Sequence, residues 1–128
     1  MKIEHIAIWV NDLEEMRAFY ERYFQVKASD LYTNPAKNFS SYFLNFKEGS
    51  RLELMHNREF SKIREVQLFE LGYAHIAISV GDKSTVNTIT EQFRSDGFTI
   101  VGEPRTTGDG YYESVILDPE KNRIEITI

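Results

Sequence analysis

The sequence predicts an α+β protein built from two similar units, each with the element order β-α-β-β-β. The segment HIAIWV at residues 5–10 returns as HIAISV at residues 75–80. The segment RLEL at residues 51–54 returns at nearly the same offset as RIEI at residues 123–126. A helical pattern preceded by an aspartate follows each opening segment. An internal repeat of this kind fixes the architecture before single elements are assigned.

Each opening segment is expected to be a strand with two different faces. Side chains alternate along a strand, so Ile6, Ile8 and Val10 share one row, whereas His5 and Trp9 lie on the other. An aliphatic row of this kind suits packing beneath a helix. We therefore expect His5, and likewise the histidine of the repeat, to face away from the helix.

The closing segments place a glutamate between aliphatic neighbours. Leu52 and Leu54 flank Glu53, and isoleucines flank Glu125 in the repeat. A carboxylate on such a strand is costly to bury unless it is paired or bound to metal. Two imidazoles and two carboxylates suit a divalent ion such as Ni²⁺, Co²⁺, Zn²⁺, Mn²⁺ or Fe²⁺. Four protein ligands would leave octahedral positions open, as a catalytic metal requires.

The remaining elements of the first half follow from caps, periodicity and turns. Asp12 is a good N-cap and Glu15 completes a capping-box pattern. The apolar helix stripe is Leu13, Met16, Phe19, Tyr20, Tyr23 and Phe24. Strands are expected at residues 26–32, 39–46 and 51–56.

The second half repeats this plan. Asp82 or Ser84 caps a helix that ends at Gly97, and its stripe is Val86, Ile89 and Phe93. Strands are expected to begin at residue 98 and to cover 111–117 and 123–128. We thus predict one domain made of unit 1–57, a linker 58–71 and unit 72–128. The linker could hold a short helix, since Phe60, Ile63 and Val66 recur at a spacing of three.

Composition excludes several function classes. A net charge of −5 without a basic stripe makes nucleic acid a poor partner. No apolar run approaches the ~20 residues of a membrane span, and no signal peptide is recognisable. Zero cysteines exclude disulfides, a thiolate nucleophile and cysteine-ligated zinc. These features lead us to expect a cytoplasmic protein that acts on a small molecule.

The whole chain resembles the vicinal oxygen chelate superfamily, and within it glyoxalase I (lactoylglutathione lyase). The resemblance lies in HIAIWV, RLELMHN, HIAISV and GDGYYESVILDPEKNRIEI. It implies the glyoxalase/bleomycin-resistance/dihydroxybiphenyl-dioxygenase fold and a homodimer. It also implies that the metal ligands are His5, Glu53, His75 and Glu125.

The same resemblance implies a reaction and further site residues. Relatives with these ligands isomerise the hemithioacetal of methylglyoxal and a small thiol to a thioester through an enediolate. By resemblance Glu125 is the base, Glu53 a ligand and second candidate base, and Asn57 a contact for the thiol. Bacterial glyoxalase I commonly has Arg where this chain has Trp9, and its DPDG turn reads DPEK here. Trp9 therefore predicts an apolar or aromatic substrate wall and argues against glutathione.

Other functions on the same scaffold stay open. Extradiol dioxygenases and fosfomycin-type thiol transferases typically use two His and one Glu, and acyl-CoA epimerases tend to have Gln at the position of Glu53. The four-ligand set argues against each of them. A metal-free or metal-bound binding or resistance protein would use Trp9 and Tyr42 to line a hydrophobic pocket. His56, which has no counterpart in the repeat, is expected to be structural.

Overall fold

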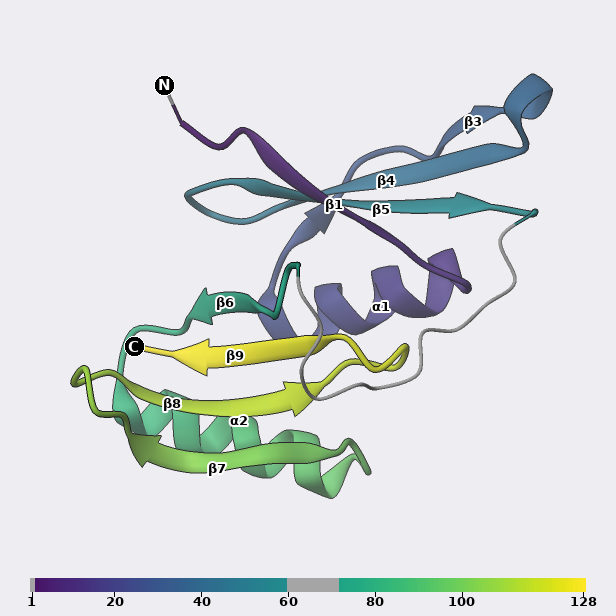
Figure 1. Ribbon diagram of the computed structural model, residues 1–128. Coiled ribbons are helices and arrows are strands. Elements are labelled where there is room, and N and C mark those ends of the chain that lie inside the picture. The colour runs from purple at the N-terminus through teal and green to yellow at the C-terminus, as the bar shows by residue number, and fades with distance from the viewer. Residues whose placement is uncertain (1, 60–71) are drawn as a thin grey trace. The chain divides into compact units, whose positions relative to one another are not determined.

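The structure is a computed structural model that describes residues 2–59 and 72–128 (Figure 1). The chain divides into two compact units, Met1–Ile63 and Arg64–Ile128, hereafter unit 1 and unit 2. This division falls inside the predicted linker. The helix predicted around Phe60, Ile63 and Val66 lies outside the described residues. Among the described residues, no helix combines the length and apolar character needed to cross a membrane.

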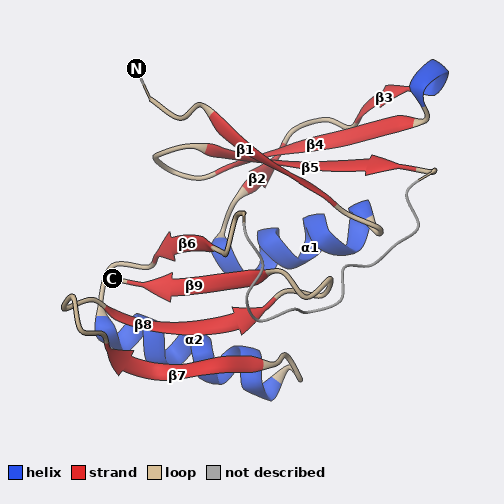
Figure 2. Ribbon diagram, viewed as in Figure 1, coloured by secondary structure: helices blue, strands red, loops and turns tan. Residues whose placement is uncertain are grey.

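Unit 1 is a mixed sheet with one long helix (Figure 2). In chain order its elements are β1 (His5–Trp9), α1 (Leu13–Phe24), β2 (Lys27–Ala28), β3 (Tyr32–Asn34), a 3-10 turn (Pro35–Lys37), β4 (Phe39–Asn45) and β5 (Arg51–Asn57). The strand order is β1-β5-β4-β2, and β3 also pairs with β4. The single strand predicted at 26–32 is thus two short strands, which pair with opposite ends of β4.

Unit 2 has the same plan with one strand fewer. Its elements are β6 (Ile76–Ser79), α2 (Lys83–Ser95), β7 (Ile100–Thr106), β8 (Tyr112–Leu117) and β9 (Arg123–Thr127). The strand order is β6-β9-β8-β7. The predicted fold class is confirmed, because both units run strand, helix and then an antiparallel set of strands.

In each unit the opening strand lies parallel to the closing strand. Ala7 of β1 pairs with Glu53 of β5, and Ala77 of β6 pairs with Glu125 of β9. The register of the repeat is therefore conserved between the two sheets. Since side chains at every second position share a face, each histidine lies on the same face as the glutamate of its own unit.

Both helices begin at an aspartate. Asp12 accepts hydrogen bonds from the backbone N–H groups of Glu14 and Glu15, and Asp82 accepts one from Thr85. These bonds satisfy donors that a helix start leaves unpaired. Asp82 rather than Ser84 is therefore the cap of α2. Gly97 follows α2 with φ 87°, a left-handed conformation that favours glycine.

The apolar row of β1 is buried less than expected. Val10 is buried, but Ile6 remains 38% exposed. The expectation that Ile6 packs beneath the helix is therefore wrong. The reason lies in the topology, because β1 is an edge strand and α1 packs mainly on β4, β5 and β2. The closing strands behave as predicted, with Leu52 and Leu54 fully in the core.

The core of unit 2 contains a polar pair that the helix pattern did not reveal. Val86 and Phe93 are buried as predicted, but Thr90 is fully buried whereas Ile89 is only partly covered. The Thr90 hydroxyl lies 2.6 Å from the carbonyl oxygen of Val86 and 2.7 Å from the Ser114 hydroxyl. Both hydroxyls are thereby satisfied inside the core, which is why a threonine is tolerated there.

Candidate functional site

Unit 1 brings its predicted histidine and glutamate together. His5 opens β1 and Glu53 lies in the middle of β5, with 3.8 Å between His5 Nε2 and Glu53 Oε2. The Glu53 side chain is 13% exposed, whereas the imidazole is far more open to solvent. A ligand can therefore approach the imidazole nitrogen beside a carboxylate that is held in place by its strand.

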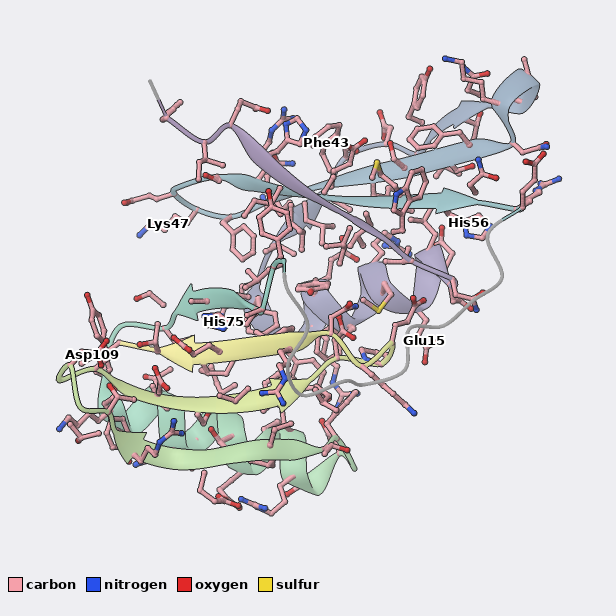
Figure 3. The ribbon with its side chains drawn as sticks, viewed as in Figure 1. Glu15, Phe43, Lys47, His56, His75 and Asp109 are labelled. Atoms are coloured by element: carbon pink, nitrogen blue, oxygen red, sulfur yellow. The ribbon has the colours of Figure 1, made fainter. Side chains whose placement is uncertain are left out.

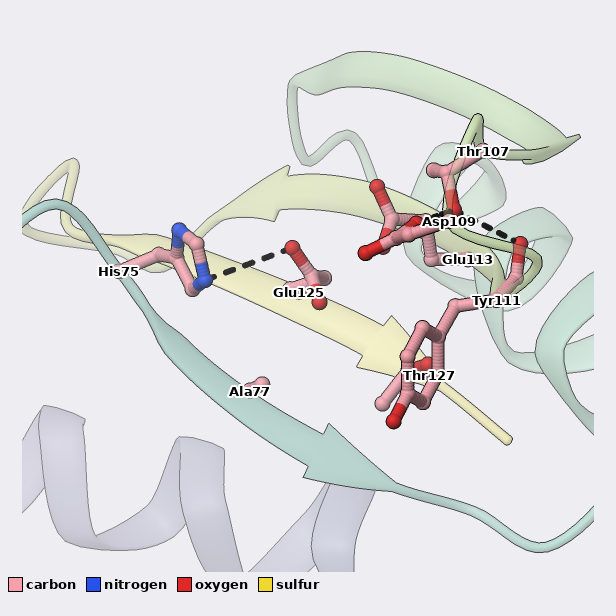
Figure 4. Close-up of a pocket in the computed structure, with 8 residues that line it drawn as sticks. All are labelled: His75, Ala77, Thr107, Asp109, Tyr111, Glu113, Glu125 and Thr127. Carbon is pink, nitrogen blue, oxygen red and sulfur yellow. Dashed lines mark hydrogen bonds and ion pairs between the residues drawn. The ribbon is translucent and has the colours of Figure 1, made fainter.

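Unit 2 contains an equivalent pair. His75 lies just before β6, and its Nε2 is 3.4 Å from Oε2 of Glu125 on β9 (Figure 4). Again the carboxylate is the less exposed partner, at 18%. The four predicted metal ligands are thus placed as two histidine–glutamate pairs, one in each unit. Each pair presents one imidazole nitrogen and one carboxylate on the sheet face that points away from the unit's helix.

A hydrogen-bonded chain supports His5 from behind. Its Nδ1 lies 2.5 Å from Oε2 of Glu4, and Glu4 is also held by the Arg51 guanidinium at 2.5 Å. The hydrogen bond from His5 and, to a smaller extent, Arg51 lower the pKa of the Glu4 carboxyl against a desolvation effect. His5 and Arg51 also contact the ring of Phe43, His5 edge-on at 5.3 Å and Arg51 at 4.1 Å between the guanidinium carbon and the ring centroid. Figure 3 labels Phe43 among the side chains of unit 1. Unit 2 has Ala74 at the position of Glu4, so this support belongs to unit 1 alone.

Unit 2 instead has a pocket of about 430 Å³ beside its pair. The pocket is lined by His75, Ala77, Thr107, Asp109, Tyr111, Glu113, Glu125 and Thr127 (Figure 4). Hydrogen bonds hold the loop at its rim, because the Thr107 backbone N–H donates to the carbonyl of Tyr111 and the Thr107 hydroxyl to Asp109. Carboxylates, hydroxyls and one aromatic ring therefore surround Glu125.

Glu113 is the residue of this pocket that sequence reasoning missed. It lies on β8, is almost completely buried and has Arg105 Nη2 at 3.5 Å. Burial, then the negative charge of Glu125 and a hydrogen bond with it, raise the pKa of Glu113, while Arg105 opposes the rise. The signal in the sequence was a glutamate inside a strand that ends in the apolar run Val115–Leu117. Only the register, with Val115 opposite Glu125, puts Glu113 on the face of the pair.

The two predicted substrate contacts differ in availability. Trp9 ends β1 on the same row as His5, and its ring is 49% exposed. Asn57 ends β5, but its carboxamide already donates to the carbonyl of Lys37 and accepts from the N–H of Glu59. These bonds fix the orientation of the Asn57 carboxamide and use one of its two N–H donors, whereas the Trp9 side chain is about half exposed. His56 Nδ1 donates to the carbonyl of Val10, in keeping with a structural role.

The donor chemistry fits a borderline divalent ion, but a single pair does not complete a site. An imidazole nitrogen and a carboxylate oxygen are ligands that Zn²⁺, Ni²⁺, Co²⁺, Mn²⁺ and Fe²⁺ accept. Across residues 2–59 and 72–128, no group of three or more histidine and acidic side chains is arranged to hold a metal. A metal at either pair would therefore need further donors.

Comparisons with known proteins agree with this architecture. Residues 2–126 match the family profile of the glyoxalase/bleomycin resistance protein/dioxygenase superfamily. Comparison with curated protein sequences found no match.

Solved structures with the same fold include glyoxalase I from two organisms. The chain superposes on glyoxalase I of Zea mays with TM-score 0.79 and 24% identity, covering 98% of this chain and 44% of the maize chain. It thus spans less than half of the maize protein. The trypanothione-dependent glyoxalase I of Leishmania major gives TM-score 0.80 and 24% identity, covering 99% of this chain and 86% of that one.

A third structure is nearly the same length as this chain. A glyoxalase/bleomycin resistance protein/dioxygenase domain from Frankia sp. gives TM-score 0.84 at 13% identity, covering 100% of this chain and 97% of that one. At these identities the structural likeness establishes the fold, and the profile match over residues 2–126 establishes the family. The chain belongs to the glyoxalase/bleomycin resistance protein/dioxygenase superfamily.

Proposed function

We propose that this protein is a glyoxalase I-like, metal-dependent lyase. Its reaction would convert the hemithioacetal of methylglyoxal and a small thiol into the thioester through an enediolate. The observation that carries the proposal is the duplicated pair, with His5 beside Glu53 at 3.8 Å and His75 beside Glu125 at 3.4 Å. Fold likeness to two glyoxalase I structures adds support.

In this proposal His5, Glu53, His75 and Glu125 hold one divalent ion, and the protein acts as a cytoplasmic homodimer. The ligand set suits Ni²⁺, Co²⁺, Zn²⁺, Mn²⁺ or Fe²⁺. When bound, such an ion supplies Lewis-acid polarisation of the substrate's oxygen atoms and stabilises negative charge on them.

Glu125 is the proposed base. Its carboxylate takes the proton from the carbon that carries the hydroxyl and returns it to the neighbouring carbon. The hydroxyl proton passes to the former ketone oxygen, so the hydroxyl carbon becomes the thioester carbonyl, the ketone becomes the new hydroxyl, and no atom is lost. Glu125 suits this role because it lies in the pocket of unit 2, next to the nearly buried Glu113. Glu53 lies at the equivalent position in unit 1, and we assign it chiefly to metal binding, with a second base role.

The first test is metal content. Protein purified without chelator should hold a stoichiometric divalent ion by plasma mass spectrometry, and Glu125→Ala should lose or weaken it. Glu125→Gln keeps a ligating oxygen, so it should retain more metal while turnover of methylglyoxal with small thiols falls by at least ~10²-fold. Glu48→Gln, at an exposed turn residue of unit 1, is the matched control and should leave both unchanged.

The opposite result would redirect the assignment. No stoichiometric metal, even after incubation with Ni²⁺, Co²⁺, Zn²⁺ or Mn²⁺, would overturn the lyase. The second candidate, a small-molecule binding or resistance protein, would then stand, and the exposed ring of Trp9 is the observation that favours it. Metal with turnover of another substrate class would favour a dioxygenase, thiol transferase or epimerase.

A further inference from the structure

Three aromatic rings gather on the site face of unit 1. Trp9 meets Phe39 edge-on, with ring centroids 6.0 Å apart, and Tyr32 meets the same ring at 6.1 Å. They come from β1, β3 and β4, and β1 is well separated in the sequence from the two consecutive strands β3 and β4 (Figure 1). We call Trp9, Tyr32 and Phe39 the aromatic patch.

Register places the aromatic patch on the face of the histidine–glutamate pair. Trp9 lies opposite Met55 on β5, which shares its row with Glu53, and Asn57 at the end of that row lies opposite Phe39. Tyr32 lies opposite Ser41, the next residue of the Phe39 row. The aromatic patch is therefore continuous with the candidate metal ligands.

The rings hold one another in place but stay open to solvent. Trp9 is 49% and Tyr32 56% exposed, whereas Phe39 is partly covered. In an edge-to-face contact the edge of one ring meets the face of the other, which fixes the ring orientations while much of Trp9 and Tyr32 stays exposed. Large apolar side chains that cluster at the surface commonly mark binding sites.

The size of the aromatic patch favours a small molecule over a second copy of the chain. An aromatic side chain can bury ~150–250 Å², so two half-exposed rings and one partly covered ring offer roughly 250 Å². A stable protein interface needs about 800 Å² per partner. The area of the aromatic patch instead suits one planar group of a small molecule.

We propose, on the basis of the lyase assignment above, that the substrate's thiol portion carries an aromatic ring that stacks on the aromatic patch. Trp9 follows His5 by four residues on the same row, or ~13 Å at ~3.3 Å per residue. A ring bonded directly to the aldehyde carbon would lie next to the reacting oxygens, too close to the pair to reach Trp9. A ring at the end of a thiol chain spans this distance, and Ala7 between the two leaves the row clear.

Trp9 is itself the probe, because the chain has one tryptophan. Metal-free protein is titrated with 2-phenylethanethiol, with ethanethiol as the aliphatic control. We expect a saturable change in tryptophan emission with the phenyl thiol alone. Phe39→Leu should weaken this binding about tenfold, and Val101→Ala, which removes exposed apolar surface in unit 2, should not change it.

The outcomes separate this inference from the lyase assignment, because binding is read without metal or turnover. No emission change with the phenyl thiol, or an equal response to ethanethiol, overturns the inference. A second result would also overturn the inference. If tryptophan emission depends on protein concentration and Trp9→Ser converts a dimer to a monomer, then a second copy of the chain covers the patch. If the protein binds the phenyl thiol but holds no metal and shows no turnover, the lyase assignment is overturned and the aromatic patch remains a binding site for the phenyl thiol.

Discussion

His5 donates from Nδ1 to Glu4 at 2.5 Å, and its other ring nitrogen, Nε2, faces Glu53 at 3.8 Å. A carboxylate behind a metal-binding histidine fixes its tautomer and raises its basicity, and loss of such a partner typically costs ~10–100-fold in metal affinity. Glu4→Ala should therefore weaken divalent-ion binding by about this factor, measured by competition with a chromophoric chelator. Glu4→Gln, which keeps an acceptor oxygen, should lose less.

Tautomer assignment gives this prediction a structural readout. Long-range ¹H–¹⁵N spectra of metal-free protein should show His5 protonated on Nδ1 in the wild type and mixed in Glu4→Ala. Unchanged affinity together with an unchanged His5 tautomer would show that Glu4 only pairs with Arg51.

The buried hydroxyls of Thr90 and Ser114 should behave as a coupled pair. The Thr90 proton goes to the carbonyl of Val86, so Ser114 must donate to Thr90. Thr90→Val leaves the Ser114 hydroxyl without this partner and should cost about 1–3 kcal/mol of unfolding free energy. The double variant with Ser114→Ala should be more stable than Thr90→Val alone, as urea denaturation would reveal. Simple addition of the two single effects would rule out the coupling.

Asp118 gives the turn before β9 a pH-dependent stability. Burial raises its pKa to about 6, although its carboxylate accepts hydrogen bonds from Asn122 and from the N–H of Glu120. The folded state therefore holds this proton in a range where the unfolded chain, with a usual value near 3.8, has released it. Its contribution to stability is largest at low pH and falls as pH rises from about 4 to about 6.

The test of Asp118 compares unfolding free energies between pH 4 and 7. Asp118→Asn should remove the contribution of Asp118 to the pH dependence of the unfolding free energy. The difference in unfolding free energy between wild type and variant should therefore change by on the order of 2 kcal/mol between pH 4 and 7. Asn122→Ala, which removes a donor to the carboxylate, should keep the slope and raise the pKa further. A constant difference between wild type and Asp118→Asn would contradict the prediction.

The two helix caps should contribute similar stability within their own units. Asp12→Ala and Asp82→Ala each remove the acceptor for backbone N–H groups at a helix start, which typically costs ~1 kcal/mol. The asparagine variants keep an acceptor oxygen and should cost less. Thermal unfolding followed by circular dichroism would measure both pairs, and equal losses for alanine and asparagine would argue that the caps act through charge alone.

Sequence repetition predicted the fold and the two pairs because strand alternation and identical spacing depend on local pattern. Glu113 and Glu4 escaped prediction for different reasons. Glu113 reaches Glu125 only through the register of β8 against β9, which no local pattern encodes. Glu4 matters through a contact with the adjacent His5 that has no equivalent in the repeat. Ile6 was misplaced because an apolar row does not reveal which strand lies at the sheet edge.

The parallel pairing of β1 with β5, and of β6 with β9, has a consequence for biosynthesis. Each histidine stands at the start of its unit and each glutamate at the end, so neither pair can assemble until that unit has been fully translated and its last strand has docked. Non-local pairings of this kind form late in folding, because the entropy cost of closing the intervening loop must be met before the strand contacts stabilise the fold. A nascent or truncated unit would thus lack a paired histidine and glutamate. The proposed metal ion could therefore bind only after the unit has folded.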